Sequence, residues 1–322
     1  MCLVALAIDQ NRRFPLVLAA NRDEFFQRPA ARLAWWTPAE GGHAVLSGRD
    51  LESGGTWLGL TAQGRLALLT NIRDSKRVDP AAPSRGKVVP EWLAGRESAG
   101  QFWMRTALSG HNGFNLIAAD FRRGECFWAS STAAHPQRLE RGVYGLSNAG
   151  LDTPWPKVQR LKTQLRESLA AAESVDALAA LLFAALADRE PAPDESLPQT
   201  GVRLDLERQL SSAFIRTPDH SYGTRCSTLI ITERAGRQPL THVLERTFSA
   251  TGGVALLRRS TLRNWPPRYT DEGAGAVAEQ AAVAESELFG EGSVPAPPRR
   301  TRVRSLLKPD IGRRKRSPAV RA

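Results

Sequence analysis

Two short apolar runs at the start of the chain strongly limit how it can fold. The first, Leu3 to Ile8, lies directly behind Cys2, and the second extends from Phe14 to Ala20. A polar loop at 9–13 separates them, and the sequence Asn-Arg-Asp-Glu follows at 21–24. Runs of this length suit β-strands and are far too short to span a membrane. They predict a hairpin that brings Cys2, Arg22 and Asp23 together at one end of a sheet.

The rest of the pattern places strands first, helices in the middle and strands last. We expect early strands at 44–47, 56–60 and 65–70, helices near 87–94 and 98–108, a hairpin over 113–120 and 125–129, and a strand at 142–147. Apolar residues spaced by three and four from Trp155 to Leu169 predict an amphipathic helix that begins at Thr153-Pro154. A second helix is expected over 178–186, and strands return at 212–216, 228–233 and 240–248. This order predicts an antiparallel α+β domain over residues 1–250.

The positive charge of the chain is concentrated at its end. Residues 251–322 hold 14 Lys and Arg against 7 Asp and Glu, a net +7 out of +11 for the whole chain. The segment 290–322 is rich in Pro, Arg and Ser, which is typical of disorder. We therefore expect 251–322 to be a disordered tail that the domain does not need for stability. Its RRKR sequence could bind RNA or lipid, although such tails are usually solvated; no DNA partner is expected.

Several classes of site are excluded by the sequence. The three cysteines lack ligand spacing and the five histidines are scattered, so neither a disulfide framework nor a metal site is expected. The Gly-x-Gly-x-x-Ala sequence at 273–278 follows no strand and is rejected as a dinucleotide site. The apolar start lacks the basic segment of a signal peptide, and no apolar run reaches about 18 residues. The expected location is the cytoplasm.

Cys2 is the strongest candidate for chemistry. Methionine aminopeptidase removes Met1 when a small residue follows, so we expect a mature chain that begins with Cys2. Its α-amine, with a pKa of about 8, could act as the general base for its own thiol. Arg22 would favour the thiolate, Asp23 would orient the amine or the guanidinium, and the strand-end residues Asn71 and Asn148 could stabilise an oxyanion. The alternative is that these are a small terminal residue, solvated charges and turn asparagines.

A set of motifs resembles the NRDE family, which includes the transport and Golgi organisation protein 2 group. The motifs occur in order over residues 1–250: Met1-Cys2, LAANRDEFFQRP (18–29), SGRDLESGGTWLGL (47–60), LALLTN (66–71), HNGFNLIAAD (111–120), YGLSNAGLDTPWPK (144–157) and YGTRCSTLII (222–231). The resemblance implies a four-layer αββα sandwich of the N-terminal-nucleophile hydrolase type, with two antiparallel sheets between helical layers.

The family is distantly similar to choloylglycine hydrolases and penicillin V acylases. Those enzymes use an N-terminal Cys, an Arg, an Asp, two Asn and a later Arg. The matching positions are Cys2, Arg22, Asp23, Asn71, Asn148 and Arg225, with Arg216 as the alternative for the later Arg. Here the Arg and the Asp are adjacent, whereas the hydrolases separate them.

Two functions are implied by this resemblance. The first is Cys2-dependent hydrolysis of a non-peptide amide or an acyl thioester, which requires no cofactor. The second is a carrier that binds haem or an acyl-CoA without cleaving it. The chain offers no obvious axial His for haem, while Arg22, Arg73, Lys76 and Arg225 could surround the phosphates of an acyl-CoA.

Overall fold

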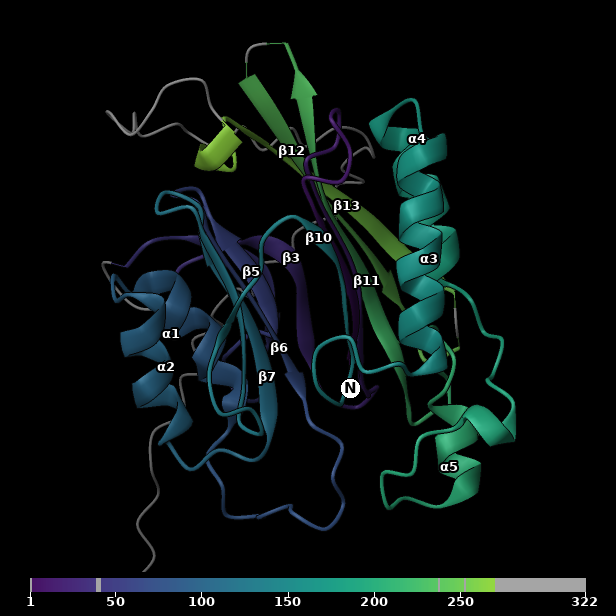
Figure 1. The fold of residues 1–322 in the computed structure, drawn as a ribbon. Coiled ribbons are helices and arrows are strands. Elements are labelled where there is room, and N and C mark those ends of the chain that lie inside the picture. Colours follow the sequence, from purple (N-terminus) through teal and green to yellow (C-terminus); the bar gives the residue numbers. More distant parts are fainter. Residues whose placement is uncertain (1, 39–41, 237, 252, 270–322) are drawn as a thin grey trace, which may run out of the picture. The chain divides into compact units, whose positions relative to one another are not determined.

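Two antiparallel β-sheets carry the fold of the protein (Figure 1). The computed structural model describes residues 2–38, 42–236, 238–251 and 253–269. The first sheet has the order β10-β1-β2-β11-β12-β13, with β10 at Gly142–Leu146, β1 at Cys2–Ile8, β2 at Leu16–Phe25, β11 at Tyr222–Ala235, β12 at Gln238–Phe248 and β13 at Val254–Arg263. The second runs from β3 to β9 in sequence order, with β3 at Ala30–Trp36, β4 at Val45–Asp50, β5 at Leu58–Thr61, β6 at Arg65–Asn71, β7 at Phe114–Asp120, β8 at Glu125–Ser130 and β9 at Gln137–Arg138.

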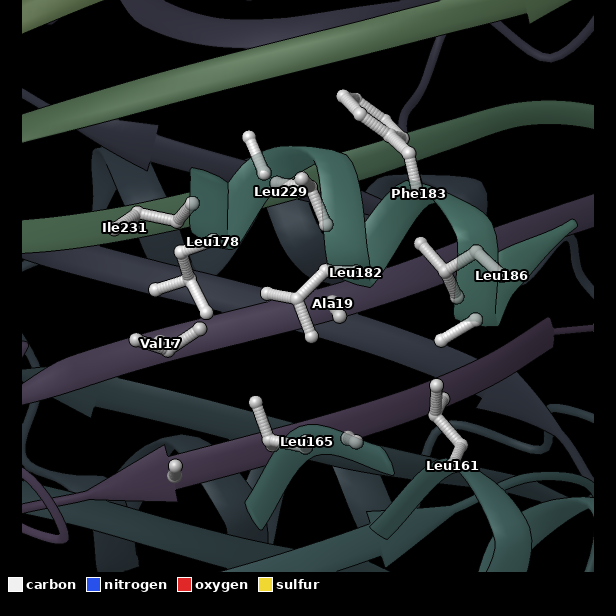
Figure 2. Close-up of a cluster of buried hydrophobic side chains, with 14 of the residues drawn as sticks. Val17, Ala19, Leu161, Leu165, Leu178, Leu182, Phe183, Leu186, Leu229 and Ile231 are labelled. Carbon is white, nitrogen blue, oxygen red and sulfur yellow. The ribbon is translucent and has the colours of Figure 1, made fainter. Parts of the chain in front are cut away.

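Helices cover the outer face of each sheet. Helices α3 (Pro156–Ala171) and α4 (Val175–Leu186) pack on the first sheet. Figure 2 shows their leucines, among them Leu165 and Leu182, against Val17, Ala19, Leu229 and Ile231 of the strands. Helices α1 (Val88–Ala94) and α2 (Ala99–Ala107) pack on the second sheet through Trp92 and Phe102. A short helix, α5 (Leu204–Gln209), follows α4. None of the described helices is long and apolar enough to cross a membrane.

A third apolar cluster fills the space between the two sheets. It contains Val4, Leu6 and Leu18 from the first sheet, and Leu68 and Ile117 from the second. All seven residues of β1 are buried, because helices cover one of its faces and the second sheet covers the other. This explains the unbroken apolar run of β1, since a strand with a single buried face would alternate. The four layers are helices, sheet, sheet and helices, which confirms the expected α+β αββα sandwich.

The hairpin of β1 and β2 fixes the position of the N-terminal residues. The two strands pair with Cys2 opposite Arg22 and Ile8 opposite Leu16. On its other side β2 pairs with β11, where Cys226 lies opposite Arg22 and Thr224 opposite Asp23, with a bulge between them at Arg225. The expected hairpin is therefore present. It lies inside the first sheet, between β10 and β11, so that β1 and β2 each have a strand on both sides.

Three expectations from the sequence are corrected. Residues 212–216 form no strand and contribute only an isolated bridge at Arg216, although most of the segment is buried. Strand β3 was not expected, and six of its seven residues are exposed or only partly buried. Helix α3 has its N-cap at Trp155 instead of Thr153, because the Thr153 hydroxyl donates to the Gly150 carbonyl in the preceding turn.

The domain boundary expected at residue 250 lies too early. Strand β13 pairs with β12 beyond that point, from Val254 to Arg263. Trp265 is buried in the cluster between the sheets and donates through Nε1 to the Thr61 carbonyl at 2.9 Å. Residues 254–265, which were expected to belong to the tail, therefore form the last strand of the first sheet and part of the apolar core between the sheets. The expected tail over 270–322 lies outside the described residues.

Candidate active site

Cys2 lies at the edge of a cavity of about 520 Å³ between the ends of the two sheets. From the first sheet the cavity is lined by Cys2, Arg22 and Cys226, and from the second by Leu69 and Asn71. Residues within the segments 28–32, 48–57 and 82–86, which include the start of β3 and the end of β4, contribute further walls. Cys2 is 7% exposed as a residue and borders this cavity, so a ligand in the cavity can approach its thiol.

Strand alternation separates Arg22 from Asp23. Arg22 has the same orientation as Ala20 and projects between the sheets, on the side of Cys2. Asp23 has the orientation of Ala19 and turns toward the helical layer, where Thr224 Oγ1 donates to its Oδ1 at 2.7 Å. Asp23 still borders the cavity at the strand end. The two neighbours in the sequence therefore act from opposite faces of the sheet.

Arg22 shares its charge with two carboxylates. Its Nη2 lies 3.4 Å from Asp50 Oδ2 and 3.8 Å from Glu24 Oε2. Asp50 also binds Arg28 at 2.6 Å. Burial would raise the pKa of Asp50, but hydrogen bonds from Arg28 and from the Ser53 N–H lower it on balance. Asp50 therefore carries a negative charge that pairs with both arginines. The sequence did not single it out, although it lies in the SGRD motif.

The protonation of Cys2 differs from the sequence expectation. Burial raises the pKa of its thiol to about 11, against the lowering effect of Arg22. Desolvation outweighs the guanidinium because that charge is already shared with Asp50 and Glu24. At neutral pH the thiol is protonated, so a reaction at Cys2 needs a base to remove the proton.

The two asparagines hold different positions. Asn71 lines the cavity, and no hydrogen bond of its side chain is found among the described residues. Asn148 is buried and donates through Nδ2 to the Asn71 carbonyl at 2.7 Å. The Ser147 hydroxyl, 3.2 Å from Asn148 Oδ1, donates to the Cys2 carbonyl at 2.9 Å. Ser147 and Asn148 therefore tie the ends of β1 and β6 together, and the Asn71 amide can donate to a ligand.

Arg225 borders the cavity, whereas Arg216 is not among the residues that line it. The Nη1 of Arg225 donates to three carbonyls of the turn after β2, those of Phe25, Phe26 and Arg28. Its guanidinium also lies 5.2 Å from the centre of the Phe26 ring. Arg225 therefore holds the turn at 25–28 in place, and its side chain also borders the cavity.

The cavity has a basic lining. Six arginines and four carboxylates border it; the arginines are Arg22, Arg28, Arg32, Arg49, Arg85 and Arg225. Of the residues expected to surround an acyl-CoA, Arg73 and Lys76 are not in this lining. No histidine is found among the described residues that border the cavity.

Comparisons with known proteins agree with the motif pattern. The chain matches the family model described as Transport and Golgi organisation 2 over residues 1–250. It is 36% identical over 288 residues to the Transport and Golgi organization protein 2 homolog of Bos taurus, which covers 84% of this chain and 96% of that protein. Its identity to the Homo sapiens homolog is 33% over 259 residues, with coverages of 75% and 92%.

Two solved structures also align with the chain. One is a mutant of the conjugated bile acid hydrolase from Clostridium perfringens, at a TM-score of 0.43 and 11% identity, covering 80% of this chain and 92% of that chain. The other is the Caenorhabditis elegans ortholog of N-acylethanolamine-hydrolyzing acid amidase, at a TM-score of 0.41 and 10% identity, with coverages of 71% and 92%.

Proposed function

The chain belongs to the Transport and Golgi organisation 2 family, and from this membership and the geometry around Cys2 we propose that it is a hydrolase with Cys2 as its nucleophile. The bond it cleaves is a non-peptide amide or an acyl thioester. The observation that carries the proposal is the Cys2 thiol at the edge of a cavity of about 520 Å³, with Arg22 directly across the strand and the Asn71 amide in the same lining.

The reaction requires a mature chain that begins at Cys2. The α-amine then takes the thiol proton, and the Cys2 sulfur attacks the acyl carbon to form a thioester with the protein. The bond to the nitrogen or sulfur of the leaving group breaks, and that group takes the proton from the amine. Water then hydrolyses the thioester, which releases a carboxylic acid and restores the thiol. A base is needed because burial of Cys2 disfavours the thiolate.

The remaining residues have supporting roles in this proposal. Asn71 donates to the oxyanion that forms on the attacked carbonyl, and Asn148 holds Asn71 in place through its carbonyl. Asp23, which accepts from Thr224, fixes the orientation of the α-amine. Arg22 faces the developing negative charge on the side of the thiol.

The lining of the cavity points to an acyl donor with an anionic part. Trp57 and Leu69 offer apolar surface to an acyl chain. Arg32, Arg49 and Arg85 also border the cavity, and none of the three forms an ion pair within the described residues. Guanidinium groups of this kind suit phosphate or carboxylate groups. An acyl-CoA combines both features.

Hydrolysis assays test the proposal. Purified protein is incubated with acyl-CoA thioesters and with N-acyl amides, and the release of free acid is measured. We expect turnover that Cys2→Ala abolishes and that Cys126→Ala preserves, because Cys126 is a buried cysteine outside the cavity. Equal turnover in the Cys2→Ala variant would refute the proposal.

A carrier is the second candidate, favoured by the burial of the thiol and the basic lining of the cavity. It predicts saturable binding of acyl-CoA that survives Cys2→Ala and is accompanied by no release of acid. Haem would fit less well, since no histidine borders the cavity in the described residues and Cys2 is protonated at neutral pH. The arginines could pair only with its carboxylates. Titration with acyl-CoA and with haem distinguishes the two ligands.

A further inference from the structure

The short turn before α1 brings Arg85 to the wall of the cavity. The Ser84 hydroxyl accepts from the Gly86 N–H at 3.2 Å, and the Gly86 carbonyl accepts from the Thr56 N–H at 3.1 Å. Arg85 lies between these two anchored residues, is partly buried and borders the cavity. The backbone that carries Arg85 is therefore held in place before any ligand binds.

The guanidinium of Arg85 lies beside the end of β6. Its Nη1 donates to the Gly113 carbonyl at 3.0 Å, and the same carbonyl accepts from the Ile72 N–H at 2.9 Å. Ile72 directly follows Asn71, the last residue of β6. Since a peptide bond of about 1.3 Å joins these two residues, Arg85 Nη1 lies within about 7 Å of the Asn71 backbone. Arg85 and Asn71 are therefore neighbours in the lining of the cavity.

Hydrogen bonds connect this part of the wall to Cys2. The Ser147 hydroxyl donates to the Cys2 carbonyl at 2.9 Å and lies 3.2 Å from Asn148 Oδ1. Asn148 Nδ2 donates in turn to the Asn71 carbonyl at 2.7 Å. In the proposed function the attacked carbonyl lies between Cys2 and Asn71. Arg85 therefore lies at the reacting end of the cavity.

The charge of Arg85 has no close counter-charge. Glu24 is the carboxylate that acts on it electrostatically, but Glu24 lies 3.8 Å from Arg22. Among the described residues, no carboxylate lies within 4.0 Å of the Arg85 guanidinium, and the Gly113 carbonyl is its one hydrogen-bond acceptor. Most of its N–H donors therefore remain for a ligand. A guanidinium in this state suits a carboxylate, which it can bind through two parallel hydrogen bonds.

The position of Arg85 limits which anion it can serve. The phosphates of a CoA ester lie at the far end of the pantetheine arm, and an extended arm carries them away from Asn71. Arg49 is better placed for such a distant anion, because it belongs to β4, two strands from β6, and its guanidinium lies over the Trp36 ring at 4.6 Å. Arg85 instead meets a group that is close to the scissile bond.

We propose that Arg85 determines substrate specificity at the Cys2 site by binding a carboxylate that the substrate carries a few bonds from its scissile carbonyl. Short dicarboxylic acyl groups such as succinyl have this chemistry, and so does a thiol leaving group with a carboxylate near its sulfur. The proposal rests on the proposed function in taking the carbonyl between Cys2 and Asn71 as the reacting one. It adds a negative charge beside that carbonyl.

Binding of succinyl-CoA and butyryl-CoA to the Cys2→Ala protein, measured by isothermal titration calorimetry, tests the proposal without turnover. The two esters have the same phosphates and differ in one carboxylate. We expect succinyl-CoA to bind about tenfold more tightly, because hydrogen bonds between charged groups contribute at least that much. Arg85→Met in the same background should bind both esters equally. Arg85→Lys, which keeps the charge, should retain part of the preference.

A second pair of probes carries the carboxylate on the leaving group. It consists of the butyryl thioester of 3-mercaptopropionate and the methyl ester of that compound. A preference for the acid in this pair alone assigns the carboxylate to the leaving group, and a preference in the CoA pair alone assigns it to the acyl group. Either result supports the proposal if Arg85→Met removes the preference.

Arg49→Met supplies the matched control. Arg49 also borders the cavity and forms no ion pair within the described residues, so its loss should weaken both CoA esters alike and leave their ratio unchanged. Equal binding, or none, of the charged and the neutral probe in both pairs would overturn the proposal. So would a preference that survives in folded Arg85→Met or that disappears equally in Arg49→Met. A protein that shows this preference but releases no acid with Cys2 intact would refute the hydrolase alone.

Discussion

Cys2, Arg22 and Cys226 form a row across the end of the first sheet. The pairing of β1, β2 and β11 sets this row, and all three side chains border the cavity. Two strand spacings, about 10 Å, separate the two cysteines, so they cannot form a disulfide without movement of the backbone. The row therefore presents one thiol on each side of a guanidinium, and only Cys2 adjoins Ser147 and the strand-end asparagines.

The buried thiol leads to a prediction about reactivity. In the folded chain with Met1 in place, Cys2 should react with iodoacetamide at pH 7 about a hundredfold more slowly than an exposed thiol, because its pKa is raised by burial to about 11. Since a raised pKa keeps the proton on, the rate should still rise between pH 9 and pH 11. The same residue labelled in denaturant is the control. Equal rates in the folded and denatured protein would contradict this account.

The residue-scale features differ in how far the sequence foretells them. The two apolar runs were enough to predict that Cys2 lies beside Arg22, because a hairpin with a short loop leaves little freedom of register. The separate orientations of Arg22 and Asp23 follow from strand alternation. The anchoring of Asn71 by Asn148 could not be predicted from the sequence, because it depends on a contact between the two sheets. The burial of Lys157 in α3 could not be predicted, because a lysine in an amphipathic helix is normally exposed.

At the scale of elements, two loops meet to build one wall of the cavity. The Thr56 N–H donates to the Gly86 carbonyl at 3.1 Å, which joins the loop after β4 to the turn before α1. A Cβ at Gly55 would lie 1.8 Å from the Gly86 oxygen. Only a glycine permits this approach, so the Gly54-Gly55 sequence has a packing role besides its turn.

Gly55→Ala should therefore damage both stability and the cavity. The loops must move apart, at a cost of about 1–3 kcal/mol in the free energy of unfolding. Affinity for an acyl-CoA should fall as well, because Ser53, Thr56 and Gly86 border the cavity. Chemical denaturation and ligand titration measure the two effects. Gly100→Ala in α2, where a Cβ would meet nothing within 4 Å, should be neutral or slightly stabilising. Wild-type behaviour of Gly55→Ala would contradict the contact.

Apolar spacing predicted the elements where it was strong. The leucines of α3 and α4 repeat at helical steps, and both helices are present within a few residues of the expected positions. The segment 212–216 is largely buried as a strand would be, but the Ser212 hydroxyl donates to the Phe214 carbonyl and the Phe214 N–H donates to the Asp188 carbonyl. Only its end, at Ile215 and Arg216, bonds to β11. Burial alone could not distinguish these outcomes. Strand β3 has mostly exposed side chains and gave no apolar signal.

At the scale of the whole molecule, β13 and Trp265 close the sandwich. Strand β13 covers the edge of β12, and Trp265 reaches the second sheet through Thr61 while its carbonyl accepts from Thr241. Its ring packs edge-on against Phe121 at 5.5 Å. The α+β sandwich was predictable from the order of the elements and from the family motifs. Its last strand was not, because the charge and composition of the segment resembled the sequence that follows.

A chain shortened after residue 250 should be markedly destabilised. It loses the pairing of β13 and the buried Trp265, whose truncation alone typically costs about 3–5 kcal/mol. Thermal unfolding should show a large drop in melting temperature, and Trp265→Ala should reproduce much of it. A chain shortened after residue 285 keeps both features and is the control. If the chain ending at 250 melts like the one ending at 285, the segment does not contribute to stability.

The central claim is that Cys2 forms a thioester with the acyl group of its substrate. Its most direct test is the intact mass of the protein, recorded before and shortly after mixing with an acyl-CoA. We expect a chain that lacks Met1, gains one acyl group on Cys2 within the first turnover and loses it as acid is released, with no adduct in Cys2→Ala. A chain that keeps Met1, or that binds the acyl-CoA without acquiring an acyl group, would contradict the claim.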